Sequence, residues 1–318
     1  MTRLRTPVCG LLGIELPILQ AGMAGWTTPE LVAAVSNAGG LGIIGGLRLS
    51  ADELRRDIRR VRELTSRPFG VNHVVCLLDE AAFEVTLAQR VSVLSLAWGR
   101  SSELTYRAHD AGLKVVHMVT SPEEAGQVAD DGADVLVAQG TEGGGHVGHM
   151  STLPLVPQVV DAVGGVPVLA AGGIADGRGL AAVLMLGAQG ALMGTRFLAT
   201  DEARSRGRSK DVILNAKGSQ TVASKFYDDI LEIVWPGSLV RSIQHPLLDE
   251  WAERPEDWGL VADQLRPALQ AAIAAGDFVL AGESSGLVHD IVPAGELVAR
   301  IALEAEAALE SGYGPPRT

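Results

Sequence analysis

The chain has few cysteines, few aromatic residues and no long apolar run. Its two cysteines, Cys9 and Cys76, are too few for a disulfide framework or a cysteine-rich metal site. Cys76 follows the apolar pair Val74-Val75, and we expect it to be a small core residue rather than a nucleophile. No apolar run is long enough and free enough of charge to span a bilayer, and the N-terminus lacks the apolar region of a secretory signal. We therefore expect a cytoplasmic protein without a membrane partner.

Basic residues are also in the minority. The chain has 26 Lys and Arg against 38 Asp and Glu, which gives a formal net charge of -12. This balance argues against a general nucleic-acid binder, which needs a basic face. Apolar residues make up 47% of the 318 residues, enough for one large domain or for a domain with a substantial insertion.

Short apolar runs alternate with amphipathic helical stretches over the first two-thirds of the chain. Near-continuous apolar strands between helices indicate a parallel sheet covered on its outer face. About eight such units predict an α/β protein with a (β/α)₈ TIM barrel, and an open, doubly wound sheet is the alternative. The expected strands are 17–22, 41–46, 69–75, 91–98, 114–120, 135–140, 166–173 and 191–198, and the expected helices include 28–38, 51–65, 121–131 and 177–186.

The βα rhythm breaks after Leu198. Residues 213–283 carry no clear βα repeat and read as helices and loops. We expect them to form a small helical second domain, inserted over the barrel mouth. Residues 1–212 and 284–318 would then make up the barrel domain, with a closing helix near the C-terminal end.

Two charged features accompany this break in the pattern. The basic run Arg204, Arg206, Arg208 and Lys210 is expected to be an exposed loop, and docking of an acidic partner such as an acyl carrier protein is the alternative. The pair Asp228-Asp229 is expected to cap or decorate a solvated helix.

A glycine-rich octet, Gln139 to His146, follows the sixth expected strand. Its four glycines keep side chains out of the way, so a flat or charged ligand can approach the backbone closely. His146 at the end of the octet can take or give a proton near neutral pH. The octet therefore predicts a cofactor site with a proton-transfer group. His146 and His149 lack a supporting carboxylate or cysteine in their spacing, so no metal is expected.

Glycines follow the next two expected strands as well. Gly172-Gly173 ends the seventh strand, and Gly194-Thr195 lies in the eighth. In barrels these two loops often hold a phosphate through backbone N–H groups, although tight turns alone would also use glycine. A phosphate anchor beside a flat approach suits FMN, because the chain has no dinucleotide fingerprint after its first strand. The amides of Gln139 and Asn72 either bond the polar edge of the flavin or are satisfied within the barrel core.

These strand ends resemble the nitronate monooxygenase family, formerly called 2-nitropropane dioxygenases. The resemblance rests on 17–25, 69–72, the GTEGGGH loop, AAGGIADGRG and 193–197, with later matches at 286–288 and 296–298. It implies an FMN-dependent enzyme with His146 as the active-site histidine. With Gly145 and Gly172 added from the glycine runs, the predicted FMN contacts are Gly22, Met23, Asn72, Gln139, Gly144, Gly145, Gly172, Gly173, Leu192, Met193, Gly194 and Thr195.

The chain departs from the family pattern at three positions. Gly22 stands where proline is frequent, His73 where an apolar residue is usual, and Glu283 where glutamine is frequent. These departures are expected to fall around the substrate side. They leave the substrate open more than the flavin.

Three functions follow from these observations. The leading one is oxidation of an alkyl nitronate or nitroalkane, with FMN and O₂, to a carbonyl compound and nitrite, with His146 handling the α-proton. The alternative is an NAD(P)H-dependent enoyl-thioester reductase, because flavin-dependent enoyl-acyl-carrier-protein reductases carry a very similar loop. A flavin- or phosphate-binding barrel without redox turnover is the third. The expected partners are a small-molecule substrate and O₂, with an acyl carrier protein only under the alternative, and a homodimer stays open.

Overall fold

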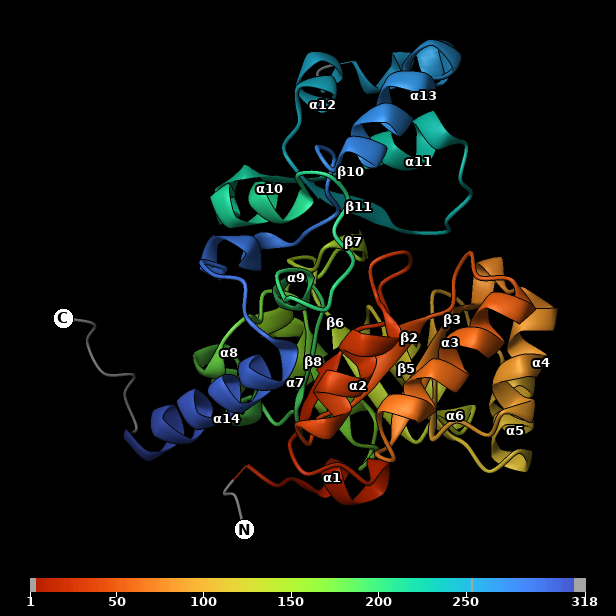
Figure 1. The fold of residues 1–318 in the computed structure, drawn as a ribbon, viewed down its shortest axis with the longest axis vertical. Coiled ribbons are helices and arrows are strands. Elements are labelled where there is room, and N and C mark those ends of the chain that lie inside the picture. The colour runs from red at the N-terminus through yellow and green to blue at the C-terminus, as the bar shows by residue number, and fades with distance from the viewer. Residues whose placement is uncertain (1–3, 253, 312–318) are drawn as a thin grey trace.

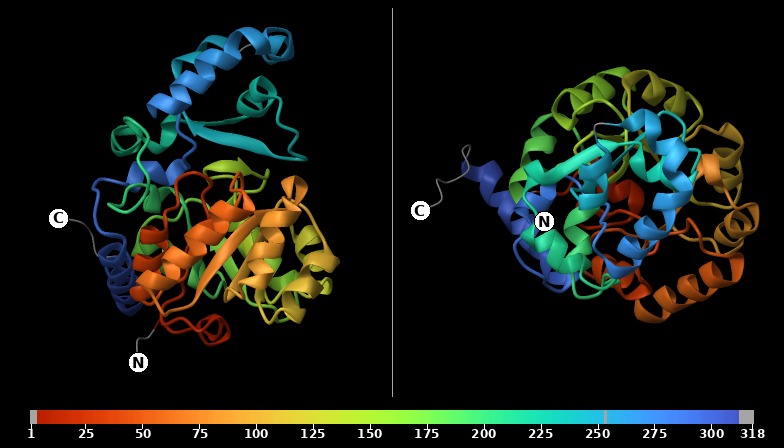
Figure 2. Two further views of the ribbon diagram at one scale, coloured as in Figure 1. Left: turned by 45° about the vertical axis from the view of Figure 1, so that its right-hand side comes forward. Right: turned by 90° about the horizontal axis from the view of Figure 1, so that it is seen from above.

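The computed structural model describes residues 4–252 and 254–311. Among them, eight parallel strands form one sheet in the order β1-β9-β8-β6-β5-β4-β3-β2. A bridge between Leu19 and Leu41 joins the two ends of this order, so the sheet closes into the predicted barrel inside a ring of helices (Figure 2). The strands are β1 (Ile18–Gln20), β2 (Gly42–Gly45), β3 (Phe69–Val74), β4 (Val93–Ala97), β5 (Lys114–Val119), β6 (Val135–Gln139), β8 (Val168–Ala171) and β9 (Ala191–Met193).

Most of the surrounding helices begin at residues whose side chains cap the free backbone N–H groups. Ser50 begins α3 with a reciprocal capping box to Glu53, and α3 then buries Leu54, Ile58 and Val61 against the sheet at helical spacing. The helices of the barrel are α2 (Pro29–Asn37), α3 (Ala51–Leu64), α4 (Glu80–Ala88), α5 (Ser102–Asp110), α6 (Pro122–Asp130), α7 (Thr152–Ala162), α8 (Gly177–Met185) and α14 (Ala294–Ser311).

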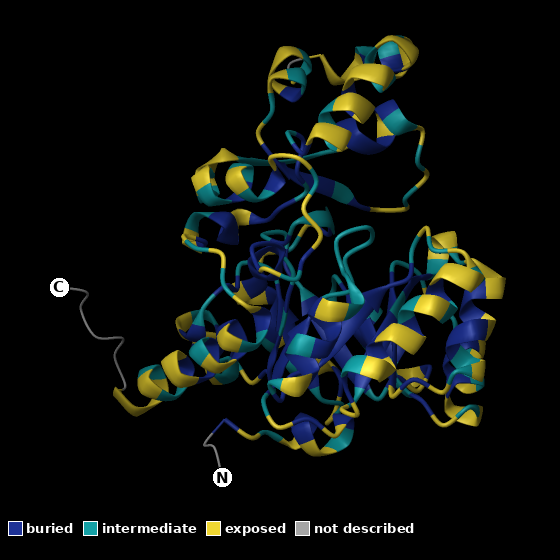
Figure 3. Cartoon of the chain, in the orientation of Figure 1, coloured by how far each residue is buried: buried dark blue, intermediate teal, exposed yellow. Residues whose placement is uncertain are grey.

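The inside of the barrel is filled with apolar side chains. Leu19, Ile43 and Val137 belong to one buried cluster together with Val8 and Leu12 of helix α1 (Pro7–Leu12). Helix α1 therefore closes the end of the barrel that lies opposite the inserted segment (Figure 1). Burial is concentrated on the strands, whereas the outer faces of the helices are exposed (Figure 3). The carboxyl ends of the strands are left to build a site.

The inserted segment contains strands as well as helices, which corrects the prediction of helices and loops alone. Strands β10 and β11 form an antiparallel sheet with β7, which comes from the glycine octet. Each strand is short and outside any repeat, so the pattern did not reveal it. The elements of this part of the chain are α10 (Ser209–Asn215), β10 (Thr221–Ser224), α11 (Phe226–Leu231), β11 (Leu239–Ile243), α12 (Pro246–Trp251) and α13 (Trp258–Ala275), with 3₁₀ turns at Gly218–Gln220 and Pro255–Asp257. Outside it lie β7 (Gly145–Val147) and 3₁₀ turns at Val75–Leu77 and Glu283–Leu287.

Two further local predictions are wrong. The expected strand 191–198 ends at Met193, and helix α9 (Thr195–Leu198) follows directly, because a short apolar run does not distinguish a strand from a buried helical turn. Cys76 is exposed rather than a core residue, since it lies in a turn beyond the end of β3. No helix within the described ranges is apolar enough over a sufficient length to cross a membrane.

Candidate active site

The glycine octet is fixed to the barrel by the carboxylate of Glu142. That carboxylate accepts hydrogen bonds from the backbone N–H of Thr152 at 2.9 Å and from its hydroxyl at 2.8 Å, at the start of α7. A side chain on Gly140 would collide with the Thr152 hydroxyl, at 2.0 Å from a built Cβ. This glycine is therefore required for the loop to reach Thr152. The contact turns a flexible sequence into an ordered wall of the barrel mouth.

The end of the octet forms strand β7 and carries His146 into the inserted layer. β7 pairs antiparallel with β11, with Gly145 opposite Arg241 and His146 opposite Val240. The Arg241 side chain, only 10% exposed, donates from Nε to the carbonyl of Thr141 at 2.8 Å and also contacts Glu283 at 3.3 Å. Arg241 thus connects the insertion to the octet and fixes where β7 runs.

His146 is enclosed by side chains from two distant parts of the chain. Its Nε2 lies 3.0 Å from Oδ1 of Asp228 on α11, and the two side chains are 11% and 7% exposed. Trp235 stacks on the imidazole with ring centroids 3.5 Å apart and an angle of 8° between the planes. Trp98 approaches edge-on at 6.3 Å. The imidazole is therefore oriented by a carboxylate and by two indole rings.

The backbone of Trp98 and the unpaired indole N–H of Trp235 indicate a binding site beside His146. Trp98 directly follows β4 and has a backbone φ of 58°, a conformation that bulky residues rarely adopt. Nε1 of Trp235 is buried and has no hydrogen-bond partner among the described residues. Unpaired buried donors are uncommon in folded proteins, so a bound molecule near His146 would remove this cost.

The amides predicted to bind the flavin lie at the ends of their strands, as expected for a barrel site. Gln139 ends β6, and its Oε1 is buried without a partner among the described residues. Asn72 on β3 donates from Nδ2 to the carbonyl and hydroxyl oxygens of Ser95, at 3.3 and 3.2 Å. Its carbonyl oxygen is the part of the amide left for a ligand. The buried, unpaired Oε1 of Gln139 and the carbonyl oxygen of Asn72 both suit a ring edge that carries N–H groups.

The predicted glycines fall into two groups when a Cβ is built on each. Gly194 would meet nothing closer than the Met23 sulfur at 3.6 Å, and Gly145 meets nothing within 4 Å. These two leave open space for a ligand. Gly22 would collide with the Asn72 Cβ at 2.6 Å, and Gly144 with the backbone of Gly282 at 2.6 Å. Close packing of the chain on itself is thus enough to explain the last two.

The glycines after β8 lie next to the loop after β9, because these strands are neighbours in the sheet. Gly172 and Gly173 have φ values of 95° and 73°, which favour glycine regardless of any ligand. Thr195 is buried, and its hydroxyl accepts the N–H of Gly282 at 2.9 Å. The Thr195 hydroxyl still has its own O–H group to donate, and the backbone N–H groups of this loop are the other donors for a phosphate.

The remaining predicted contacts surround the same mouth. Met23 is half-buried and packs against the core, while Leu192 is partly buried and Met193 is buried. Strand β9 pairs with β1, which places Met193 beside Gln20, three residues before Met23. The structure thus brings the predicted contacts to one end of the barrel, and their role toward FMN stays a prediction.

Besides Gly22, whose packing against Asn72 is described above, the other two departures from the family pattern also have a local explanation. His73 points away from the barrel interior, because its Nε2 bonds the hydroxyl of Thr86 on α4 at 2.7 Å. Its expected place on the substrate side is therefore wrong. Burial lowers the pKa of His73 to about 4. Glu283 contacts Arg241 and belongs to the connection between insertion and octet.

The basic run after α9 is largely used within the chain. Arg206 donates to the carbonyl of Gly25 at 3.4 Å and lies over the ring of Trp26. Lys210 donates to the carbonyl of Thr200 at 2.6 Å, and Arg208 approaches Asp277 at 3.7 Å. These contacts favour a structural role for the run over a free basic docking surface.

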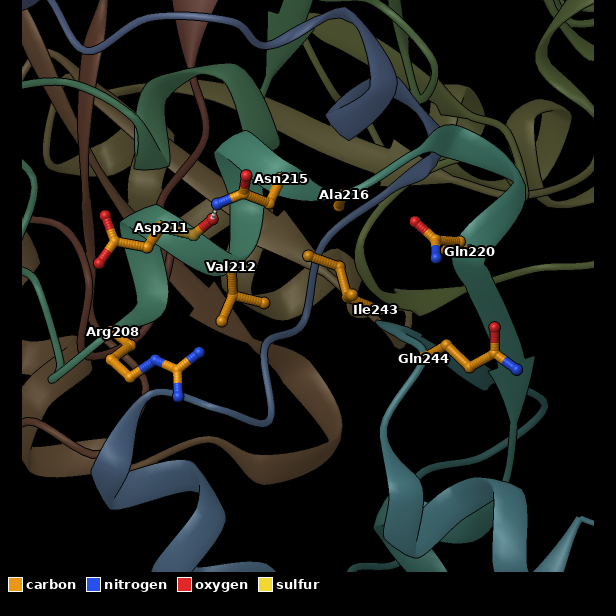
Figure 4. Close-up of a pocket in the computed structure, with 8 residues that line it drawn as sticks. All are labelled: Arg208, Asp211, Val212, Asn215, Ala216, Gln220, Ile243 and Gln244. Carbon is orange, nitrogen blue, oxygen red and sulfur yellow. Dashed lines mark hydrogen bonds between the residues drawn. The ribbon is translucent and has the colours of Figure 1, made fainter.

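A separate pocket of about 240 Å³ lies between α10 and the insertion (Figure 4). It is open to solvent and lined by both polar and apolar side chains, and it contains none of the predicted site residues. Its lining residues are Arg208, Asp211, Val212, Asn215, Ala216, Gln220, Ile243 and Gln244. The candidate active site is therefore the strand ends and His146, not this pocket.

Sequence reasoning missed the partners that the insertion supplies. Asp228 was expected to decorate a solvated helix, but it is buried against His146. The spacing of Phe226, Tyr227 and Ile230 around it was the one available sign of a buried helix face. Trp235 stood out only as one of five tryptophans in a chain that is 4% aromatic.

Comparison with known proteins agrees with this architecture. The model of the nitronate monooxygenase family matches residues 5–83 and 79–304, so the chain belongs to the nitronate monooxygenase family and is an oxidoreductase. It is 36% identical over 294 residues to a probable nitronate monooxygenase of Staphylococcus aureus, covering 78% of this chain and 80% of that protein.

Other relatives carry different names. The chain is 42% identical over 246 residues to the (3aS,4S,5R,7aS)-5-hydroxy-7a-methyl-1-oxo-octahydro-1H-indene-4-carboxyl-CoA dehydrogenase of Mycobacterium tuberculosis, covering 76% of this chain and 69% of that protein. The structure of FabK from Thermotoga maritima matches with a TM-score of 0.87 and 36% identity, over 96% of this chain and 98% of that one. Nitroalkane oxidase from Streptomyces ansochromogenes matches with a TM-score of 0.82 and 32% identity, over 95% and 99%.

Proposed function

We propose that the protein is an FMN-dependent oxidoreductase that oxidises nitroalkanes or their nitronates with O₂ to a carbonyl compound and nitrite. The observation that carries the proposal is a buried imidazole, bonded to a carboxylate, at the mouth of a barrel where the strand end at Gln139 holds a buried acceptor that is unpaired among the described residues. Membership of the nitronate monooxygenase family and the likeness to a nitroalkane oxidase support this substrate class.

The residues present fit FMN. The orphaned acceptor of Gln139 and the free carbonyl of Asn72 would face the polar edge of the ring, while Gly173 and Gly194 would offer backbone N–H groups to the phosphate. When bound, FMN would supply the redox chemistry, accepting the electrons of the substrate and passing them to O₂.

The protein would supply position and proton transfer. His146 would take the α-proton of the substrate, and a base held in place typically contributes ~10²–10⁴-fold to a rate. Trp98 and Trp235 would keep water from the imidazole and hold it in one orientation. A dry surrounding strengthens the attraction between the protonated imidazole and the anion that forms.

Two measurements test this function. The purified protein should release FMN, identified by chromatography, in a ratio of about one per chain. Under anaerobic conditions, nitroethane or ethyl nitronate should bleach the flavin absorbance rapidly, and neither NADH nor NADPH should do so. Bleaching by NADH or NADPH alone would contradict the proposal, and a colourless protein that binds no flavin would favour a barrel without redox turnover.

The second candidate is an oxidoreductase of acyl thioesters. A relative that is named as a CoA-ester dehydrogenase and is 42% identical, together with the likeness to FabK, favours it. The same imidazole would then move a proton at the carbon or oxygen next to the thioester. In the anaerobic experiment, this candidate predicts flavin bleaching by NAD(P)H, or by a hydroxyacyl-CoA, and none by the nitro compounds.

A further inference from the structure

The contact between His146 and Asp228 joins two residues that are 82 positions apart in the chain. It is a hydrogen bond between α11 of the insertion and the glycine octet of the barrel, and both side chains are almost fully buried. A buried carboxylate is costly unless it is paired, so the pair is maintained by the fold rather than by chance at a surface. The pair also affects the imidazole of His146.

A carboxylate can only accept hydrogen bonds when it is ionised. Nε2 of His146 must therefore carry the proton in the neutral ring, and Nδ1 is then the nitrogen with the free lone pair. Nδ1 has no hydrogen bond to another described residue. A carboxylate partner also stabilises the imidazolium that forms when Nδ1 accepts a proton.

The aromatic side chains prevent the ring from exchanging its two nitrogens. Trp235 covers one face of the imidazole at 3.5 Å, and Trp98 stands against it edge-on. Turning the ring over would break the stack and the bond to Asp228 together. Aromatic contacts of this kind contribute ~0.5–1.5 kcal/mol each beyond the area that they bury.

We propose that Asp228 is a positioning residue that fixes His146 as a base acting through Nδ1. This inference rests on the proposed function. In the step, the α-proton of a nitroalkane moves to Nδ1, and the electron pair of the C–H bond stays on the substrate as the nitronate.

The test compares Asp228→Asn with Asp229→Asn in the FMN-loaded protein. Asp229 is the exposed neighbour on the same helix, so it controls for the loss of one negative charge on α11. With ¹⁵N-labelled histidine, NMR of the unaltered protein should show the His146 ring protonated at Nε2. Asp228→Asn should lose this fixed preference, and Asp229→Asn should keep it. The His146 signal is assigned by its absence from His146→Gln.

Kinetics provide the second readout. Asp228→Asn should lower kcat on nitroethane by about 10²-fold with little change in KM, a loss in the range of a general base. Its activity on ethyl nitronate should fall far less, and Asp228→Glu should recover part of the loss on nitroethane. A structural role alone would lower activity on both substrates equally.

Two results would overturn the inference. One is a His146 ring protonated at Nδ1 in the unaltered protein, which is observable whether or not nitro compounds are substrates. The other is an equal loss on nitroethane and ethyl nitronate in Asp228→Asn. If the protein oxidises neither compound, the proposed function fails while the NMR result still decides the role of Asp228.

Discussion

The barrel and the inserted segment contribute different things to one site. The barrel offers strand ends with glycines and amides, arranged by a regular βα repeat. The insertion has no repeat, yet it supplies Asp228 and Trp235, which hold the imidazole of His146. Regular secondary structure thus prepares a surface for a cofactor. The irregular part orients the group that would transfer the proton.

The octet is where the two regions meet. Its first half is bonded to the barrel through Glu142, and its second half becomes a strand of the insertion sheet. A change on either side should therefore affect a different property. Changes in the insertion should alter turnover, whereas changes at the strand ends should alter FMN binding.

Loss of the imidazole should have the largest effect. His146→Gln should lower kcat on nitroethane by ~10²–10⁴-fold, because no base remains, while FMN stays bound. Flavin absorbance and steady-state kinetics measure both. The matched control is His149→Gln, an exposed histidine three residues further on, which should change neither. If His146→Gln loses its flavin together with its activity, the proposal that the barrel strand ends bind FMN while the insertion orients the base is wrong.

The second prediction concerns His73, the buried histidine of the barrel wall. Burial lowers the pKa of His73 from 6.5 to about 4 in the folded protein. As the pH falls between these values, the unfolded chain therefore takes up a proton at His73 and the folded protein does not. Stability from this group is full above pH ~6.5 and is lost as the pH falls toward ~4, by roughly 3 kcal/mol in total. His73→Gln should flatten this dependence in urea unfolding measured between these pH values. If the free energy of unfolding of His73→Gln changes with pH as steeply as that of the unaltered protein, the prediction is wrong.

Arg241 tests the connection between the regions. Arg241→Met would leave the carbonyl of Thr141 and the hydroxyl of Thr221 without their donor, at a cost of ~1–3 kcal/mol. Thermal unfolding should show a lower midpoint, and kcat should fall more than FMN affinity. Arg208→Met, at an arginine side chain that is 74% exposed, is the control and should stay close to the unaltered protein. An equal effect of both changes would show that Arg241 does not hold the octet.

The smallest predicted effect is at the phosphate end. Gly194→Ala places a Cβ where only the Met23 sulfur lies at 3.6 Å, so the fold should tolerate it. If FMN phosphate lies against this backbone, affinity should fall about tenfold, or ~1.4 kcal/mol. Titration of the apoprotein followed by flavin fluorescence measures it. Gly126→Ala, on α6 with nothing within 4 Å, is the control, and equal affinities in the two variants would place the phosphate elsewhere.

The barrel could be predicted from the sequence because its signals are local and repeated. Runs such as Val135–Gln139 and Val168–Ala171 are mainly apolar and of strand length, and capped helices lie between most of the strands. The exception is 191–198, where Gly194 divides one apolar run into a strand and a helical turn. Strand ends then follow from the fold, so Gln139 and the glycines could be placed as well.

The other half of the site could not be predicted, because it depends on contacts between distant residues. Nothing near Asp228 in the sequence indicates that it reaches His146, and Asp229 beside it is exposed. Strands β10 and β11 are equally hidden, since their partner β7 lies in a glycine-rich segment that reads as a loop. Such elements are defined by pairing and not by their own pattern.

The most direct test of the two-region site is a crystal structure of the FMN-loaded protein. We predict the phosphate against the backbone of Gly173 and Gly194, the ring edge near Gln139, and His146 facing the ring while still bonded to Asp228. FMN bound in the pocket of Figure 4, or an imidazole that has left Asp228, would contradict the account.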